Sequence, residues 1–183
     1  MSDLKIKFSG VDTSIMNSLR RIMLSEVKTI AIDIIKVGEN NGIMTDEILG
    51  HRLGLIPIKR HNKYTKKVTL TLNVSNDTDI IKTVYSSDLK YNSEDIEIPD
   101  KNIIITKLDK GHFISLIAET EEGTGYIHAK WNPTAGLAYK IENGPDDTQI
   151  FIFNIESIGN MTPKEILEEA FDTLIEKFQR ILI

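Results

Sequence analysis

The chain has 183 residues, 40% of them hydrophobic, which is enough to bury the core of one domain or of one domain with an inserted lobe. A formal net charge of −5 argues against a surface that is basic overall and binds nucleic acid along its length. The sequence has no cysteine, which excludes disulfides, iron–sulfur ligation and thiolate zinc sites.

The N-terminal segment predicts a strand followed by an amphipathic helix. Leu4, Ile6 and Phe8 alternate with lysines, as in a half-buried strand. Asp12 or Thr13 can cap the helix that follows. At about 100° per residue, one side of this helix carries Ile15, Met16, Leu19, Ile22, Met23 and Val27. Glu26 falls near the middle of this apolar stripe, which is explained only if the helix frays there.

A buried strand and a short helix are expected next. Residues 29–37 are β-branched and almost continuously apolar. Residues 46–53 read as a short helix, after which Gly54 can take the left-handed conformation and Leu55 can fold back in a Schellman-type contact. Pro57 prevents the helix from continuing.

The middle of the chain predicts mostly β structure. A polar, basic stretch at residues 59–67 has the character of a boundary between lobes. Alternating or β-branched segments then predict strands at residues 68–74, 103–108, 113–119, 126–130, 137–141 and 149–155.

The C-terminal segment predicts a well-capped helix with an unusually wide apolar face. Thr162, Pro163 and Glu165 give an N-cap, a first-turn proline and a capping box. The apolar face covers about half the circumference, more than the stripe of about 100° that one core contact requires. Its members are Ile166, Leu167, Ala170, Phe171, Leu174, Ile175, Phe178, Ile181 and Leu182. We expect this helix either to lie under the sheet or to pack against another chain.

No constellation in the sequence indicates catalysis or metal binding. The four histidines have no ligand spacing, and Gly123 and Gly125 are too close together for a dinucleotide-binding loop. The acidic pairs fall in polar loops: Glu94–Asp95, Glu121–Glu122 and Asp146–Asp147. No apolar run approaches a membrane span and the N-terminus lacks a signal-peptide core, so we expect a soluble intracellular protein.

The basic stretch at residues 59–67 leaves an alternative open, a stand-alone module that binds nucleic acid through it. Its lysines and arginine could contact a phosphate backbone. Only Tyr64 offers an aromatic platform there, so a solvated connection between lobes is the favoured interpretation.

Four blocks resemble one known family. They are residues 17–22 with 25–33, residues 46–47 with 51–58, the His-Ala-Lys-Trp-Asn-Pro block at 128–133, and residues 154–159 with the final helix from Thr162. Together they resemble the alpha-type assembly subunits of multisubunit DNA-directed RNA polymerases: bacterial alpha, its archaeal counterpart and the third-largest subunit of the nuclear enzymes. The second and third blocks resemble the archaeal and eukaryotic branch, which uses heterodimers.

This resemblance implies an α+β protein of two lobes. A discontinuous dimerisation lobe with helices on a sheet would comprise residues 1–52 and 132–183, and an inserted, mostly β lobe would comprise residues 53–131. The implied function is non-catalytic. The subunit would pair with a small alpha-like subunit to form the platform on which the two largest subunits assemble, and those subunits would hold the catalytic residues.

The resemblance also implies two contact surfaces. Pairing with the small subunit would use Ile15, Leu19, Ile22, Met23, Phe171, Leu174 and Phe178. Contact with the second-largest, beta-like subunit would use Arg20, Arg21, His51, Arg52, Gly54, Leu55 and Pro57, and which of the two arginines makes the contact stays open.

The chain also departs from some relatives. Because it lacks cysteine, no cofactor is expected, neither the zinc nor the iron–sulfur site of some relatives. No C-terminal DNA-binding domain, little or no direct nucleic-acid contact and no membrane contact are expected. The short chain would fit a compact archaeal-like form or a large DNA virus.

Overall fold

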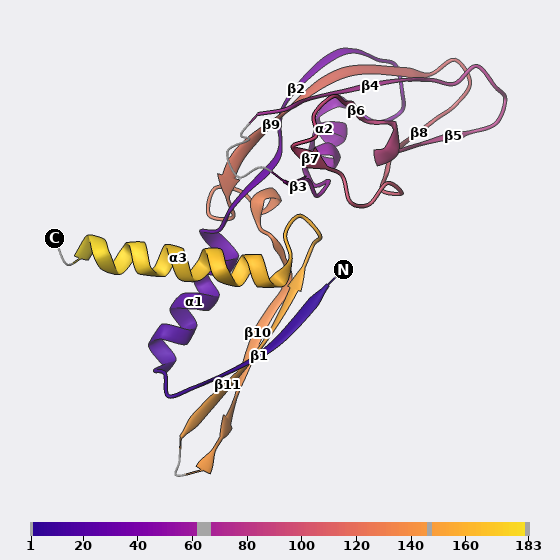
Figure 1. The fold of residues 1–183 in the computed structure, drawn as a ribbon. Coiled ribbons are helices and arrows are strands. Elements are labelled where there is room, and N and C mark those ends of the chain that lie inside the picture. Colours follow the sequence, from indigo (N-terminus) through magenta and orange to yellow (C-terminus); the bar gives the residue numbers. More distant parts are fainter. Residues whose placement is uncertain (1, 62–66, 146–147, 182–183) are drawn as a thin grey trace. The chain divides into compact units, whose positions relative to one another are not determined.

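The computed structural model describes residues 2–61, 67–145 and 148–181 (Figure 1). The chain divides into two compact units. Met1–Thr29 and Gly123–Ile183 form one, called here the discontinuous unit, and Ile30–Glu122 form the other, the central unit. Two long strands, β2 (Lys28–Asn40) and β9 (Phe113–Thr124), have residues in both units.

The discontinuous unit is an antiparallel sheet with two helices packed on one face. The strands lie in the order β1-β11-β10. Their bounds are β1 (Asp3–Ser9), β10 (Thr134–Asn143) and β11 (Gln149–Ser157), and the helices are α1 (Thr13–Ser25) and α3 (Pro163–Ile181). In Figure 1 the helices cross each other, and α3 runs on past α1 toward the C-terminus.

The core of this unit follows from the alternation of the strands. Ile6 and Tyr139 both stand opposite Phe153 in the register of the sheet, so their side chains share its inner face. The ring of Phe153 stacks on Tyr139 at a centroid distance of 4.9 Å. The helices cover this face with Met16, Leu19, Ile22, Met23, Ile166, Leu167 and Ala170.

The N-termini of α1 and α3 are capped by side chains, as the sequence predicts. The Ser14 amide donates to Asp12 Oδ1 at 2.9 Å, so Asp12 rather than Thr13 caps α1. At α3 the Thr162 amide donates to the Glu165 carboxylate at 2.7 Å, and the Glu165 amide donates back to Thr162 Oγ1 at 3.3 Å.

The position of Glu26 is explained by the end of α1. Glu26 is the C-cap residue, just outside the helix, and its amide donates to the Ile22 carbonyl. Its carboxylate is bound by the Lys177 ammonium of α3. The acidic residue therefore ends the apolar stripe instead of interrupting it.

The central unit packs one short helix, α2 (Asp46–Gly54), among several small sheets. The largest sheet has the order β2-β9-β4-β6, and β3-β7 and β5-β8 form separate pairs. Besides β2 and β9, the strands are β3 (Lys59–Arg60), β4 (Thr69–Ser75), β5 (Lys82–Tyr85), β6 (Lys90–Tyr91), β7 (Ile96–Glu97) and β8 (Ile104–Leu108), and a 3₁₀ turn, η1, spans Ser86–Asp88.

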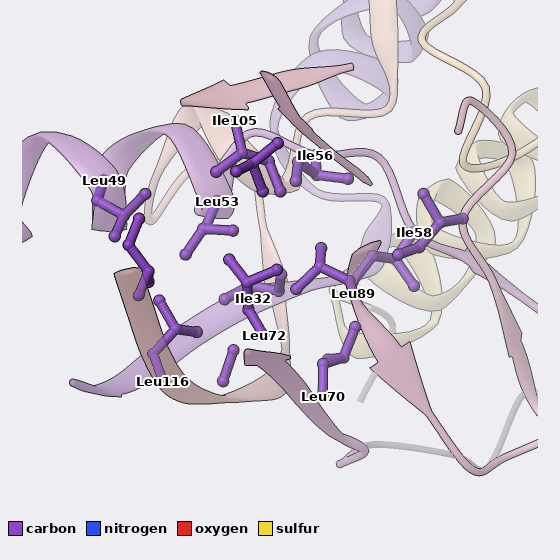
Figure 2. Close-up of a cluster of buried hydrophobic side chains, with 14 of the residues drawn as sticks. Ile32, Leu49, Leu53, Ile56, Ile58, Leu70, Leu72, Leu89, Ile105 and Leu116 are labelled. Atoms are coloured by element: carbon purple, nitrogen blue, oxygen red, sulfur yellow. The ribbon is translucent and has the colours of Figure 1, made fainter. Parts of the chain in front are cut away.

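Aliphatic side chains from every part of the central unit converge in one core (Figure 2). Leu49 and Leu53 of α2 meet Ile32 of β2, Leu72 of β4 and Leu116 of β9. Other members include Ile56, Ile58, Leu70, Leu89 and Ile105. Because all of these are aliphatic, the core is stabilised by the burial of apolar area and by close packing rather than by aromatic stacking.

Two local predictions are wrong. Gly54 is the last helical residue of α2 and does not have a positive φ, and Leu55 continues in a right-handed conformation with its amide directed at the Arg52 and Leu53 carbonyls. The helix therefore ends in a tightened turn and not in a Schellman motif. Residues 126–130 are not a strand either: they form a turn that leads into the 3₁₀ helix η2 (Ala129–Trp131).

The compact units change over at different places from the predicted lobe boundaries. The family resemblance implies boundaries at residues 52/53 and 131/132, whereas the compact units change between Thr29 and Ile30 and between Glu122 and Gly123. Helix α2 belongs to the central unit because Leu49 and Leu53 lie in its core.

Candidate subunit-interaction surfaces

The C-terminal half of α3 leaves an apolar stripe uncovered. Phe171 and Leu174 are half-buried at the edge of the core, and beyond them Ile175, Phe178 and Ile181 are 53%, 51% and 76% exposed. In the N-terminal half of the same helix, by contrast, Ile166, Leu167 and Ala170 are buried against the sheet. We call Phe171, Leu174, Ile175, Phe178 and Ile181 the α3 ridge.

The α1 residues predicted to meet a partner occupy two different environments. Leu19, Ile22 and Met23 are buried in the chain's own core, and Leu19 has no exposed surface at all. Ile15, one turn before Leu19, is exposed. Of the seven residues predicted for the dimer contact, the partly or fully accessible ones are therefore Ile15, Phe171, Leu174 and Phe178.

The two neighbouring arginines of α1 differ in what their guanidinium groups do. Arg20 is half-buried and donates from Nε and Nη2 to Asn17 Oδ1, at 3.3 and 3.1 Å. Arg21 is exposed and has no hydrogen-bond or ion-pair partner within the part of the chain that the structure describes. A partner carboxylate would therefore meet a free guanidinium at Arg21 and an occupied one at Arg20.

In the central unit, the predicted contact residues of α2 combine an anchor with an exposed face. Arg52 donates from Nε to the Ile105 carbonyl at 2.8 Å and from Nη2 to the Ile104 carbonyl at 2.5 Å. These two bonds hold α2 against β8. His51 and Leu55 are exposed, Pro57 is half-buried, and Gly54 is buried.

The structure adds an α2 residue that the sequence analysis missed. Ile48 is 53% exposed and stands two helical turns before Leu55, so both lie on the outer face of the helix. The spacing of Ile48 and Leu55 places them on one side of the helix. In a helix as short as α2, however, two apolar residues seven positions apart do not show whether that side is exposed or buried.

Two described residues of the basic stretch 59–67, Arg60 and Lys67, form ion pairs. Residues 62–66, which include Tyr64, lie outside the described residues. Arg60 meets Glu122 at 2.7 Å, and Lys67 meets Glu119 at 2.6 Å. The hydrogen bonds from Lys67 and Lys36 lower the pKa of Glu119 to about 2. These bases are neutralised by acids of their own unit, which disfavours a phosphate-binding role.

The described residues form neither a metal-binding cluster nor a membrane-spanning helix. Among them, no three His, Asp or Glu side chains gather as a metal site would require. No helix in the described ranges is both long enough and apolar enough to cross a bilayer. The acidic pair Asp146–Asp147 lies outside the described residues.

The fold is that of an α+β protein in which two helices cover a three-stranded sheet, and in the sequence a strand-rich unit is inserted between the two segments that form this layer. Residues 5–178 match the family model of the RNA polymerase Rpb3/Rpb11 dimerisation domain, and the chain belongs to this family.

Named relatives agree with this assignment. The chain is 44% identical over 170 residues to the DNA-directed RNA polymerase subunit Rpo3 of Methanocaldococcus jannaschii, covering 92% of this chain and 83% of that one. It is 30% identical to subunit Rpo3 of Pyrobaculum aerophilum, with 96% and 88% covered. It is 33% identical to the RNA polymerase II subunit rpb3 of Dictyostelium discoideum, covering 86% of this chain and 58% of the relative.

Proposed function

We propose that this chain is a non-catalytic assembly subunit of a DNA-directed RNA polymerase, and that it pairs with a small alpha-like subunit. The family and the Rpo3 and rpb3 relatives support the polymerase assignment. Within such an enzyme it works with the transcription machinery, and an assembly role of this kind needs no metal or cofactor of its own. The competing function, stand-alone nucleic-acid binding, is disfavoured by the ion pairs of Arg60 and Lys67.

The observation that carries the pairing proposal is the α3 ridge. Apart from the adjacent Leu174 and Ile175, successive members are three residues apart, so they form one stripe along the helix. A contiguous apolar stripe of this kind is typical of a surface that a partner covers. A partner helix laid along it would remove most of its apolar area from water, at about 25 cal/mol per Å².

The buried residues of α1 support this surface without forming it. Leu19, Ile22 and Met23 fix the crossing of α1 and α3 from beneath, which determines where the ridge lies. Ile15 adds an exposed apolar side chain from α1. We therefore place the partner contact on Ile15 and the α3 ridge, and we assign the three buried residues to the scaffold of a dimerisation lobe.

The experiment that tests this proposal is co-expression with the small alpha-like subunit of the same polymerase. Size-exclusion chromatography with light scattering should give a stable 1:1 complex. Phe178→Ser should weaken this complex strongly, because it removes a central aromatic anchor. Gln179→Ser, the next residue on the same exposed helix end, is the matched control and should leave the complex unchanged. Two chains that stay separate, or equal effects of the two variants, would contradict the proposal.

For the second-largest subunit, we propose contacts from each unit separately. In the discontinuous unit the free guanidinium favours Arg21 over Arg20. In the central unit the outer face of α2 offers Ile48, His51 and Leu55, while Arg52 keeps the helix in place through its bonds to β8. Gly54 and Pro57 then act by shaping the corner after the helix.

A further inference from the structure

The turn between β9 and η2 exposes two consecutive large side chains. Tyr126 is 85% exposed and Ile127 is 68% exposed. Neither side chain contributes to the core of the discontinuous unit, to which the turn belongs. Scattered single apolar residues on a surface are ordinary, but an aromatic and an aliphatic neighbour together at the tip of one turn form a small contiguous patch.

The two glycines at the base of this turn are packed too tightly to accept a side chain. A Cβ on Gly125 would lie 2.3 Å from the Leu24 carbonyl oxygen, and a Cβ on Gly123 would lie 2.5 Å from the indole of Trp131. Only glycine permits both approaches. The close packing holds the turn against the end of α1 on one side and against a buried tryptophan on the other.

Hydrogen bonds fix the tip itself. The Tyr126 amide donates to the Ser25 carbonyl at 2.8 Å, and the Ile127 amide donates to the Thr124 carbonyl at 3.0 Å. Beyond the tip, the Thr29 hydroxyl donates to the Trp131 carbonyl at 2.7 Å. The two exposed side chains therefore project from an ordered backbone, and little backbone entropy is lost when a partner binds them.

Three basic residues lie close in sequence to the residues that the turn contacts or leads into. Arg21 lies one turn before Ser25 on α1, and Lys28 follows Ser25 by three residues, and both are exposed. The ammonium of Lys130 lies 4.3 Å from the centre of the Trp131 ring. The nearby carboxylate of Glu26 is already bound by Lys177. An apolar tip with a cationic border is complementary to an apolar pocket with an acidic border.

We propose that Tyr126 and Ile127 are the anchor of the discontinuous unit for a protein partner whose surface has an apolar pocket bordered by carboxylates, and that this surface belongs to the second-largest polymerase subunit. The assignment to that subunit rests on the proposed function, through Arg21, which lies one helical turn before the Ser25 carbonyl that Tyr126 contacts. A nucleic-acid partner is the poorer fit, because Ile127 can neither stack on a base nor bind a phosphate. Tyrosine is among the residues that carry most binding energy at protein interfaces.

The test uses the chain in complex with its small alpha-like partner and measures how tightly this complex binds the purified second-largest subunit. The double variant Tyr126→Ser/Ile127→Ser should weaken that binding by about tenfold or more. The matched control is Ile80→Ser/Ile81→Ser, a consecutive exposed pair in the central unit, which should bind as the wild type does. The single variant Lys28→Glu should also weaken binding relative to the wild type. Its effect should grow as the salt concentration is lowered, because it places a carboxylate opposite acidic residues of the partner.

The outcomes separate this inference from the proposed function. If the wild-type complex binds the second-largest subunit and the double variant binds it equally well, the inference is overturned and the proposed function stands. If the wild-type complex does not form or does not bind that subunit, the proposed function fails first. Retained pairing of the double variant with the small subunit shows that its discontinuous unit is folded, so a loss of binding then supports the anchor.

Discussion

The two units close their cores by different means. The discontinuous unit uses two long helices on one sheet, and α3 extends past the sheet, so an apolar stripe remains where the helix has no strand beneath it. The central unit is built from short strands and turns, and polar side chains hold them together: Arg52 links α2 to β8, and Asn76 links the loop after β4 to Leu108 at the end of β8. A long helix can extend beyond the sheet on which it packs and so leave an apolar surface for a partner, as α3 does. In a unit of short elements, by contrast, polar side chains form hydrogen bonds within the unit.

The largest expected effect comes from Leu19 in the first core. Leu19→Asp places a carboxylate in a fully buried position among aliphatic and aromatic side chains, which should lower the free energy of unfolding by several kcal/mol. Chemical denaturation of the chain alone measures this. Ile15→Asp, on the exposed side of the same helix, is the control and should change the stability by less than about 1 kcal/mol. Equal losses would mean that α1 is packed the other way round.

Asn76 should show how much the central unit depends on polar clamps. Its side chain is buried, donates to the Ile80 and Leu108 carbonyls at 2.8 and 3.0 Å, and accepts from Thr78. Asn76→Ala should destabilise the chain by about 1–3 kcal/mol, because it removes the buried hydrogen bond to the Leu108 carbonyl and the acceptor for Thr78. Thermal unfolding checks this value, and a neutral result would show that water replaces the clamp.

The N-cap of α3 should contribute less. Thr162→Ala removes the acceptor for the Glu165 amide and should lower stability by about 1 kcal/mol, while Thr162→Ser should restore it. Helix content by circular dichroism and the unfolding midpoint are the readouts. If alanine and serine behave alike, packing of the buried half of α3 and not its cap determines where the helix begins.

The smallest expected effect is the dependence of stability on pH that arises from Glu119. Because Lys67 and Lys36 depress the pKa of Glu119 to about 2, this carboxylate contributes stability that is present above its ordinary pKa of 4.5 and is lost as the pH falls toward 2. Glu119→Gln should therefore narrow the difference between stability at pH 6 and at pH 2.5, and high salt should have the same effect. An unchanged pH profile would show that the ion pairs of Glu119 with Lys36 and Lys67 contribute nothing measurable to stability.

Local rules predicted much of the discontinuous unit. The Thr162–Glu165 capping box and the alternation of Leu4, Ile6 and Phe8 are complete within a few residues, so the sequence alone was sufficient. The central unit was harder, because two-residue strands such as β3 and β7 carry no periodic signal. The turn at residues 126–130 looked like a strand by composition, and only the close approach of Gly125 to Leu24, far away in the sequence, decides otherwise.

The candidate surfaces were predicted unevenly for a related reason. A helical stripe shows which residues share a side but not which part of that side its own sheet covers, so Leu19 and Phe178 were indistinguishable before the fold was known. Likewise, adjacency in sequence could not separate Arg20 from Arg21, whereas the bonds of Arg20 to Asn17 do.

The central claim is that the α3 ridge is the pairing surface. Amide hydrogen exchange of the chain, measured with and without the small alpha-like subunit, tests this claim most directly. The exchange of residues 171–181 should slow markedly on pairing, while residues 163–170, already packed on the sheet, should change little. Unchanged exchange at 171–181 in a complex that has formed, with new protection elsewhere in the chain, would contradict the account.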